Sequence, residues 1–227
     1  SGASVMALAG VNRSMAHRAN PVRRRLNPEM RRSLILDHTA DMVARDGVAS
    51  LNIENIGREA GISKSLVYAY FPNLTDLLRA LYQREMRRLR RAQHEAAANA
   101  RTFEDLVRSV THVYLHYIHD RGLIIERLQA EPRVSETQDP TDFGRDIAVD
   151  YLTDIVIRQF GLPAEIARAA TDISFGLPAS AGSYLHRHGM DLQQLEDLTV
   201  TMIIGTFAEV KAAFDAKAGQ QAATRRL

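Results

Sequence analysis

The chain has 227 residues, a hydrophobic fraction of 45%, a mean hydropathy of −0.22 and a formal net charge of +2. This length suffices for one small and one medium-sized domain, and no apolar run reaches the ~18–20 residues of a membrane span. The absence of cysteine excludes disulfides and thiolate metal sites. The apolar run at residues 5–11 is short and follows no basic region, so it does not predict a secretory signal. We therefore expect a globular cytoplasmic protein.

Charge is divided unevenly along the chain. Residues 1–91 hold 16 Lys and Arg against 8 Asp and Glu, a net of +8, whereas residues 92–227 hold 13 against 19, a net of −6. This asymmetry indicates a DNA-binding head joined to a body that does not bind DNA.

Residues 1–27 are interpreted as a flexible basic arm. They contain no acidic residue and five arginines: Arg13, Arg18, Arg23, Arg24 and Arg25. Two interpretations remain open. The arm can lie along the minor groove or the phosphate backbone, or it can be a solvated tail without a role.

Residues 28–78 show the pattern of a helix-turn-helix. A first helix is expected from Pro28, which suits a first helical turn, to Asp46 before Gly47. Two short helices then follow, joined by a tight turn at Gly61, where glycine adopts a positive φ without a steric clash. Asn52 and Ser63 are placed to cap these two helices. Such a motif places its second helix in the major groove of DNA.

Helical geometry divides the faces of that second helix. Val67 and Phe71 share the inward face, Ser65 and Ala69 point away from the core, and the other residues form two flanks. We expect the crest to touch base edges and the flanks to reach sugar and phosphate. The alternative is that the tyrosines are ordinary core aromatics. The predicted DNA-binding residues are Asn52, Lys64, Ser65, Leu66, Tyr68, Ala69, Tyr70 and Thr75.

The run from Ile56 to Asn73 closely resembles the DNA-binding domain of TetR-type transcriptional regulators. The resemblance begins near Pro28, extends to about Leu81, and includes the Ala-Gly-Ile-Ser turn and the Tyr-x-Tyr-Phe sequence at the spacing of that family. Leu74 departs from it, because the family usually has a phosphate-binding lysine there. Leu66 stands where a small polar residue is common, which suggests an apolar contact to a thymine methyl. The resemblance implies a helix-turn-helix domain at 28–80 and an effector-binding and dimerisation domain at 81–227.

The body is predicted to be all-helical, since no useful length alternates with period two. A loop is expected at residues 134–142, and Pro178 is expected to kink its helix. The predicted helices run from Thr75 past Glu95, and over residues 102–120, 123–130, 143–160, 163–187 and 192–217. The fold class is thus all-α.

The last two predicted helices favour a homodimer. Small residues at 176–183 allow close approach of another helix, and the last helix carries two apolar stripes, one of them without an evident partner in one subunit. TetR-like proteins dimerise through such a four-helix bundle. The alternative is a fully enclosed helix in a monomer. The predicted interface residues are Gly176, Ala179, Gly182, Ser183, Leu198, Ile203, Phe207 and Phe214.

Little in the sequence indicates catalysis. His112 and His116 have the i, i+4 spacing of a shared metal, with His119 one turn further on, but no carboxylate sits at matching spacing in the same helix. Ordinary satisfied or exposed histidines are therefore favoured. No glycine-rich phosphate loop or nucleophile motif is present. We expect no enzyme activity, no catalytic residue, no cofactor and no bound metal.

The expected function is sequence-specific DNA-binding regulation of transcription. The family resemblance implies a repressor that is released from a near-palindromic double-stranded operator by a small hydrophobic effector. The segment 117–126 also loosely resembles acyl-CoA-responsive regulators of that family, so a lipid-responsive activator is an alternative. A nonspecific nucleic-acid-binding protein is another. Membrane binding is not expected. The predicted effector-binding residues are Tyr117, Ile118, Ile125, Phe143, Tyr151 and Phe175.

Overall fold

The computed structural model describes residues 27–135 and 140–224, and over these ranges the chain forms eleven helices and no strand. The all-α prediction is therefore confirmed. None of the described helices is long and apolar enough to cross a membrane. The helices are α1 (Pro28–Asp46), α2 (Ile53–Glu59), α3 (Lys64–Tyr70), α4 (Leu74–Ala98), α5 (Phe103–Arg121), α6 (Ile124–Gln129), α7 (Pro132–Ser135), α8 (Pro140–Phe160), α9 (Ala164–Ser174), α10 (Leu177–His188) and α11 (Leu192–Thr224).

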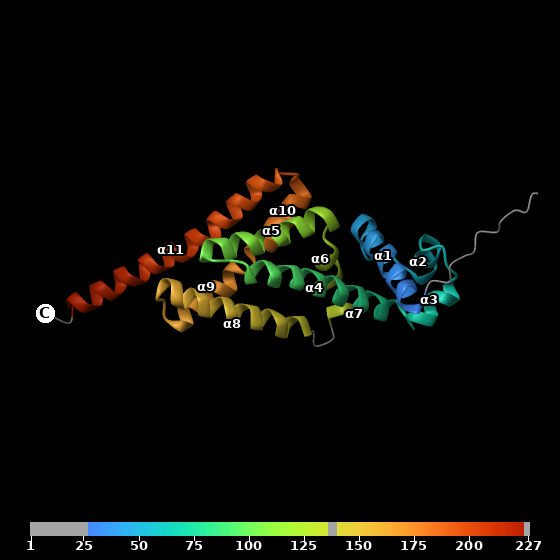
Figure 1. The fold of residues 1–227 in the computed structure, drawn as a ribbon, viewed down its shortest axis with the longest axis horizontal. Helices are drawn as coiled ribbons and strands as arrows, with labels where there is room; N and C mark the ends of the chain where they lie inside the picture. The colour runs from blue at the N-terminus through green and yellow to red at the C-terminus, as the bar shows by residue number, and fades with distance from the viewer. Residues whose placement is uncertain (1–26, 136–139, 225–227) are drawn as a thin grey trace, which may run out of the picture.

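The helices form an elongated molecule with the head at one end (Figure 1). Helices α1, α2 and α3 cluster around the start of α4, and α4 runs from this head into the body. In the body, α5 packs against α4, α10 and α11, while α8 packs against α9. The carboxyl-terminal part of α11 extends beyond the other helices, at the end of the molecule opposite the head.

Local sequence signals set most of the helix ends. The side-chain oxygen of Asn27 accepts a hydrogen bond from the backbone N–H of Met30, and Gly47 ends α1 with a φ of 78°. Thr102 and Asp105 form a reciprocal capping box at the start of α5. These contacts satisfy backbone groups that a helix end leaves without partners, so the ends predicted at these positions are confirmed.

Two predictions about the body are wrong at prolines. Pro140 begins α8 although it was placed in a loop. The short helix α7, which begins at Pro132, also extends into that predicted loop. Pro178 does not kink one long helix: α9 ends at Ser174, and a separate α10 begins at Leu177 with Pro178 in its first turn. Proline is tolerated in a first helical turn because the N–H that it lacks has no intrahelical partner there.

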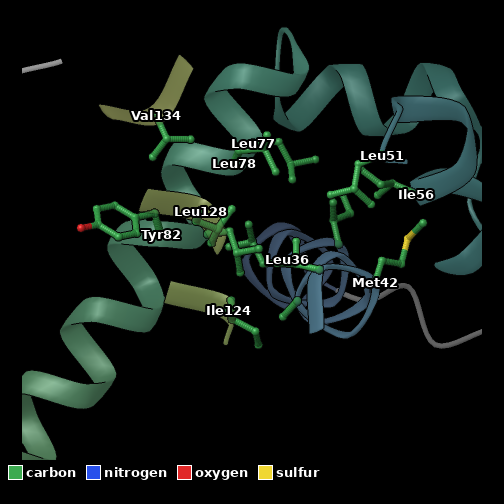
Figure 2. Close-up of a cluster of buried hydrophobic side chains, with 14 of the residues drawn as sticks. Leu36, Met42, Leu51, Ile56, Leu77, Leu78, Tyr82, Ile124, Leu128 and Val134 are labelled. Carbon is green, nitrogen blue, oxygen red and sulfur yellow. The ribbon is translucent and has the colours of Figure 1, made fainter. Parts of the chain in front are cut away.

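One hydrophobic cluster runs from the head into the body. Figure 2 shows Leu36 of α1, Leu77 and Leu78 of α4, and Ile124 and Leu128 of α6 converging on the same core. Leu77 and Leu128 are completely buried. The cluster contains residues on both sides of residue 80, so packing is continuous across the predicted boundary between 28–80 and 81–227. The division into these two domains stays a prediction.

A second hydrophobic cluster lies between α8, α9 and α11. It contains part of the apolar stripe of α11 that was predicted to form the dimer interface. Ile203 and Phe207 are 7% and 3% exposed within this cluster. The Phe207 ring lies 5.5 Å from that of Phe103 and 5.7 Å from that of Phe160, and Phe214 packs partly against the same residues. The prediction that this stripe lacks a partner within one subunit is therefore wrong for Ile203 and Phe207, which α5, α8 and α9 cover, whereas Leu198 stays exposed.

The prediction that Gly182 lies in the dimer interface is also wrong. A Cβ atom at Gly182 would lie 3.0 Å from Cγ1 of Ile118 and 3.2 Å from Cε1 of Tyr114. The glycine thus allows α10 to approach α5 inside one subunit, which removes it from a dimer face.

The buried carboxylate of Glu85 joins α1, α4 and α5. Glu85 is fully buried. It accepts hydrogen bonds from Arg84 at 2.9 Å, from Arg121 at 3.2 Å and from the Tyr117 hydroxyl at 3.1 Å. Arg84 also donates to the Asp37 carboxylate of α1 at 2.7 Å. Burial, followed by the negative charge of Glu85, raises the pKa of Tyr117 and keeps its hydroxyl protonated as a donor.

Replacing Tyr117 with Phe should lower the free energy of unfolding by roughly 1.5–3 kcal/mol, since it removes a hydrogen bond to a buried charged group. Urea unfolding followed by circular dichroism measures this. The control is Tyr151→Phe, which changes a tyrosine that is 54% exposed and should cost no more than about 0.5 kcal/mol. Equal losses in the two variants would contradict the role assigned to the Tyr117 hydroxyl.

Candidate DNA-binding site

Helices α2 and α3 meet at close range, and a glycine makes this possible. Gly57 of α2 is buried, and a Cβ atom there would lie 3.0 Å from the carbonyl oxygen of Ile62 and 3.5 Å from Cγ2 of Val67. The turn between the helices contains Gly61 with a φ of 64°. The side chain of Val67 is fully buried. These contacts fix α3 rigidly against the head.

The start of each helix is capped as the sequence predicts. The Asn52 side chain accepts a hydrogen bond from the backbone N–H of Asn55 at 2.8 Å, and Ser63 Oγ accepts one from Leu66 at 3.2 Å. Asn73, which the sequence analysis did not single out, caps α4 in the same way. Asn52 is exposed but already serves as a cap, so any contact that it makes with DNA has to share the same side chain.

The outer face of α3 is available to a partner. Lys64, Ser65 and Ala69 are exposed, and Tyr68 is 44% exposed, whereas Val67 and Phe71 are buried. The division between an inward face and an outward crest follows the predicted helical geometry.

The two tyrosines differ. Tyr68 projects from the surface, but Tyr70 is half-buried and packs against the head core. Leu66 is also half-buried, and Thr75 has an intermediate exposure at the start of α4. Leu74 packs partly against the same core, so a leucine at the position of the family's lysine contributes apolar packing.

Basic side chains flank α3. Lys64 lies 4.0 Å from the Glu54 carboxylate, an exposed pair that is worth little and leaves the ammonium group free to exchange partners. The Arg32 guanidinium lies over the Phe71 ring, 5.0 Å from its centroid. Sequence reasoning missed Arg32, because its neighbour at the end of α3 is far away along the chain. The basic arm at 1–27 lies almost wholly outside the described residues.

The predicted effector-binding residues do not share one cavity. Tyr117, Ile118 and Ile125 lie together in the core that joins α4, α5 and α6. Tyr151 instead lines an open pocket of about 280 Å³ between the end of α4, the start of α5 and α8. Phe175 lies beneath the Arg145 guanidinium, 5.3 Å from it. The side chain of Phe143 is outside the described part of the structure.

Arg127 connects the body to the head and was not predicted. Its guanidinium, carried by α6, donates to the carbonyl oxygens of Val43 and Ala44 at 2.6 and 2.5 Å. These carbonyls belong to the last turn of α1, where a positive charge is favourable. The contact joins residues more than eighty positions apart in the sequence, so no local sequence pattern predicts it.

Comparison with known proteins gives a sequence match for the head and a likeness in fold for most of the chain. Residues 35–81 match the profile of the bacterial regulatory proteins of the tetR family. No curated protein sequence matches the chain.

Three solved structures illustrate the likeness in fold. A TetR-like transcriptional regulator from Rhodococcus sp. RHA1 has 17% identity and a TM-score of 0.67, with 81% of this chain and 99% of that chain covered. A TetR-family regulator from Streptomyces coelicolor has 18% identity and a TM-score of 0.62, with 80% and 96% covered. The TetR-like regulator LfrR from Mycobacterium smegmatis, solved in complex with proflavine, has 24% identity and a TM-score of 0.60, with 78% and 96% covered.

The matched segment contains all of α2 and α3 and the start of α4, and the structural likeness extends through the helical body. Residues 35–81 therefore match the tetR family of bacterial regulatory proteins by sequence, and the described chain has the fold of TetR-type transcriptional regulators.

Proposed function

We propose that the chain is a dimeric repressor that binds a near-palindromic double-stranded operator and is released by a small effector held in its body. The observation that carries the DNA-binding part is the exposed crest of α3 on a rigid head. Lys64, Ser65, Tyr68 and Ala69 face outward, while Val67 and Gly57 hold the helix in place. A fixed helix with small residues at its crest can enter the major groove without reorganisation. The protein acts by binding, and its head and body correspond to 28–80 and 81–227.

The proposed dimer face lies on α10 and α11. With Ile203 and Phe207 buried in the subunit, the outward side of α11 presents Leu198 and Met202, which are 48% and 49% exposed. Tyr184 on α10 is 43% exposed. Of the residues first predicted for the interface, Leu198, Gly176, Ala179 and Ser183 remain part of the proposal. Pairing α10 and α11 with their copies would bury these apolar side chains in a four-helix bundle.

The effector proposal rests on two observations. LfrR, a protein of the same fold, has been solved with proflavine, which is a precedent for a small ligand. In this chain, the residues that line the pocket beside Tyr151 include Phe103 and Leu106 together with Arg101 and Arg158. A mixed lining with two arginines suits an amphipathic anion. This pocket favours a lipid-type or acyl-type effector as the second candidate, acting on a repressor or on an activator.

Fluorescence anisotropy with DNA from upstream of the chain's own gene tests the proposal. A regulator should bind one site at least about 10³-fold more tightly than unrelated competitor DNA. Deleting the gene should raise transcription of the target if the protein represses. Equal competition by unrelated DNA would refute sequence-specific binding and favour a general nucleic-acid-binding protein.

Replacing Tyr68 with Phe should weaken operator binding by about 0.5–1.5 kcal/mol, because it removes one hydrogen bond at the edge of the groove. The melting temperature should stay nearly unchanged, since Tyr68 is exposed. The control, measured without effector, is Tyr151→Phe, which is similarly exposed but lies on α8. An operator affinity that is unaltered in Tyr68→Phe would remove this hydroxyl from the interface.

Replacing Met202 with Glu should break the dimer, because each subunit would place an unpaired carboxylate in a dry contact at a cost of about 3–5 kcal/mol. Light scattering should show a monomer, and operator affinity should fall, since one recognition helix makes half of the contacts.

The matched control for this variant is Ile147→Glu, an equally radical change on α8 at a residue that is 54% exposed. It should remain dimeric. If Met202→Glu stays a dimer with normal operator affinity, the interface lies on another surface.

A further inference from the structure

Two helices of the body bring three metal-ligating side chains together. His112 and His116 lie one turn apart on α5, and Glu196 comes from α11. The ligand atoms of all three lie within 4.8 Å of one another. The two imidazole rings are 4.0 Å apart between centroids, and Nδ1 of His112 lies 2.8 Å from a carboxylate oxygen of Glu196.

The carboxylate of Glu196 is buried beside these imidazoles. Its side chain is only 4% exposed, whereas that of His112 is 49% exposed. A buried carboxylate without a compensating charge is strongly unfavourable. The nearby arginine of α5, Arg108, is directed elsewhere, since it donates to Asp197 at 2.6 Å and pairs with Glu104. The group that faces Glu196 is therefore an imidazole.

We propose that His112, His116 and Glu196 bind one divalent transition-metal ion, for which Zn²⁺ is the best match. Two imidazole nitrogens and one carboxylate oxygen are a donor set that zinc accepts, and the histidines favour it over Mg²⁺ or Ca²⁺. The i, i+4 spacing places both imidazoles on one side of α5. The sequence alone left this pair without a carboxylate, because the third ligand lies 84 residues away.

The geometry needs a small closure to reach tetrahedral coordination. Ligands bound to zinc at ~2.0–2.1 Å lie about 3.3 Å from one another. The three donors, already within 4.8 Å, have to approach by at most about 1.5 Å, which a rotation of the His112 and His116 side chains supplies. Because His112 is half-exposed, the fourth position opens to solvent and takes a water molecule.

Metal binding would replace the direct contact between His112 and Glu196 with bonds from both side chains to one ion. The bound ion ties the middle of α5 to the first half of α11, and it stabilises the folded protein in proportion to its concentration.

The site is tested on the full chain without an affinity tag, stripped of metal with a chelator. Titration with Co²⁺ should give visible absorption bands of a low-coordinate ion and saturate at one ion per chain, and Zn²⁺ should abolish the bands. His116→Ala and Glu196→Gln should each weaken binding at least about tenfold. Zinc should raise the melting temperature of the unaltered chain but not that of these variants.

The matched control is His119→Ala, which removes an exposed histidine from the same helix outside the cluster. It should bind Co²⁺ and Zn²⁺ like the unaltered chain. If Glu196→Gln loses its helical circular dichroism, His112→Ala takes its place, since a half-exposed side chain can be removed without opening the core. Failure of the unaltered chain to bind one ion, or equal affinity in all variants, would overturn the site and leave His112 and Glu196 as a simple ion pair. None of these readouts depends on DNA.

Discussion

The arrangement of this molecule depends on α4, a single helix that belongs to two cores and carries a buried charge between them. Its first turns complete the head through Leu77 and Leu78, and its later turns pack on α5. Glu85 lies where the two parts meet, and Arg84, Arg121 and Tyr117 neutralise and hold its carboxylate. Leaving such a charge unpaired would cost about 3–5 kcal/mol, a large fraction of the stability of a domain. The head and the start of the body are therefore expected to move as one unit near α4.

A second contact, between α6 and α1, also joins the head to the body. Arg127 of α6 holds the carbonyls of Val43 and Ala44, at the end of α1 away from Glu85. Two contacts at separate points on α1 define its angle to the body, and α3 follows α1 and α2 as a rigid piece because Gly57 lets the short helices touch. A change in the position of α6 would therefore tilt α3. Both Arg127 and the partner of Tyr114, Glu126, lie on α6, so this short helix connects α5 in the interior of the body to α1 of the head.

The sequence predicts what adjacent residues determine. The helix-turn-helix is predictable from Asn52, Gly61 and Ser63, because helix caps and positive-φ turns depend on local backbone chemistry. The burial of Phe207 was not predictable in this way: an apolar stripe is the same whether its partner is a second subunit or, as here, helices of the same chain. Tyr70 shows the same limit, since helical geometry places it on a flank, whereas in the structure it is half-buried against the head core.

The polar contacts of α5 bear on how the body would respond to a ligand. Helix α5 carries three of the polar contacts that join distant segments of the body. Tyr117 reaches Glu85 on α4, Tyr114 reaches Glu126 on α6, and His112 reaches Glu196 on α11. Each contact joins a polar group of α5 to a buried or half-buried carboxylate, and such contacts tolerate little displacement because an unsatisfied buried charge is costly. A ligand that shifts α5 must therefore alter several of them together. This favours two discrete arrangements of the body over a gradual deformation, which is the condition for a binding event in the body to change the position of the head.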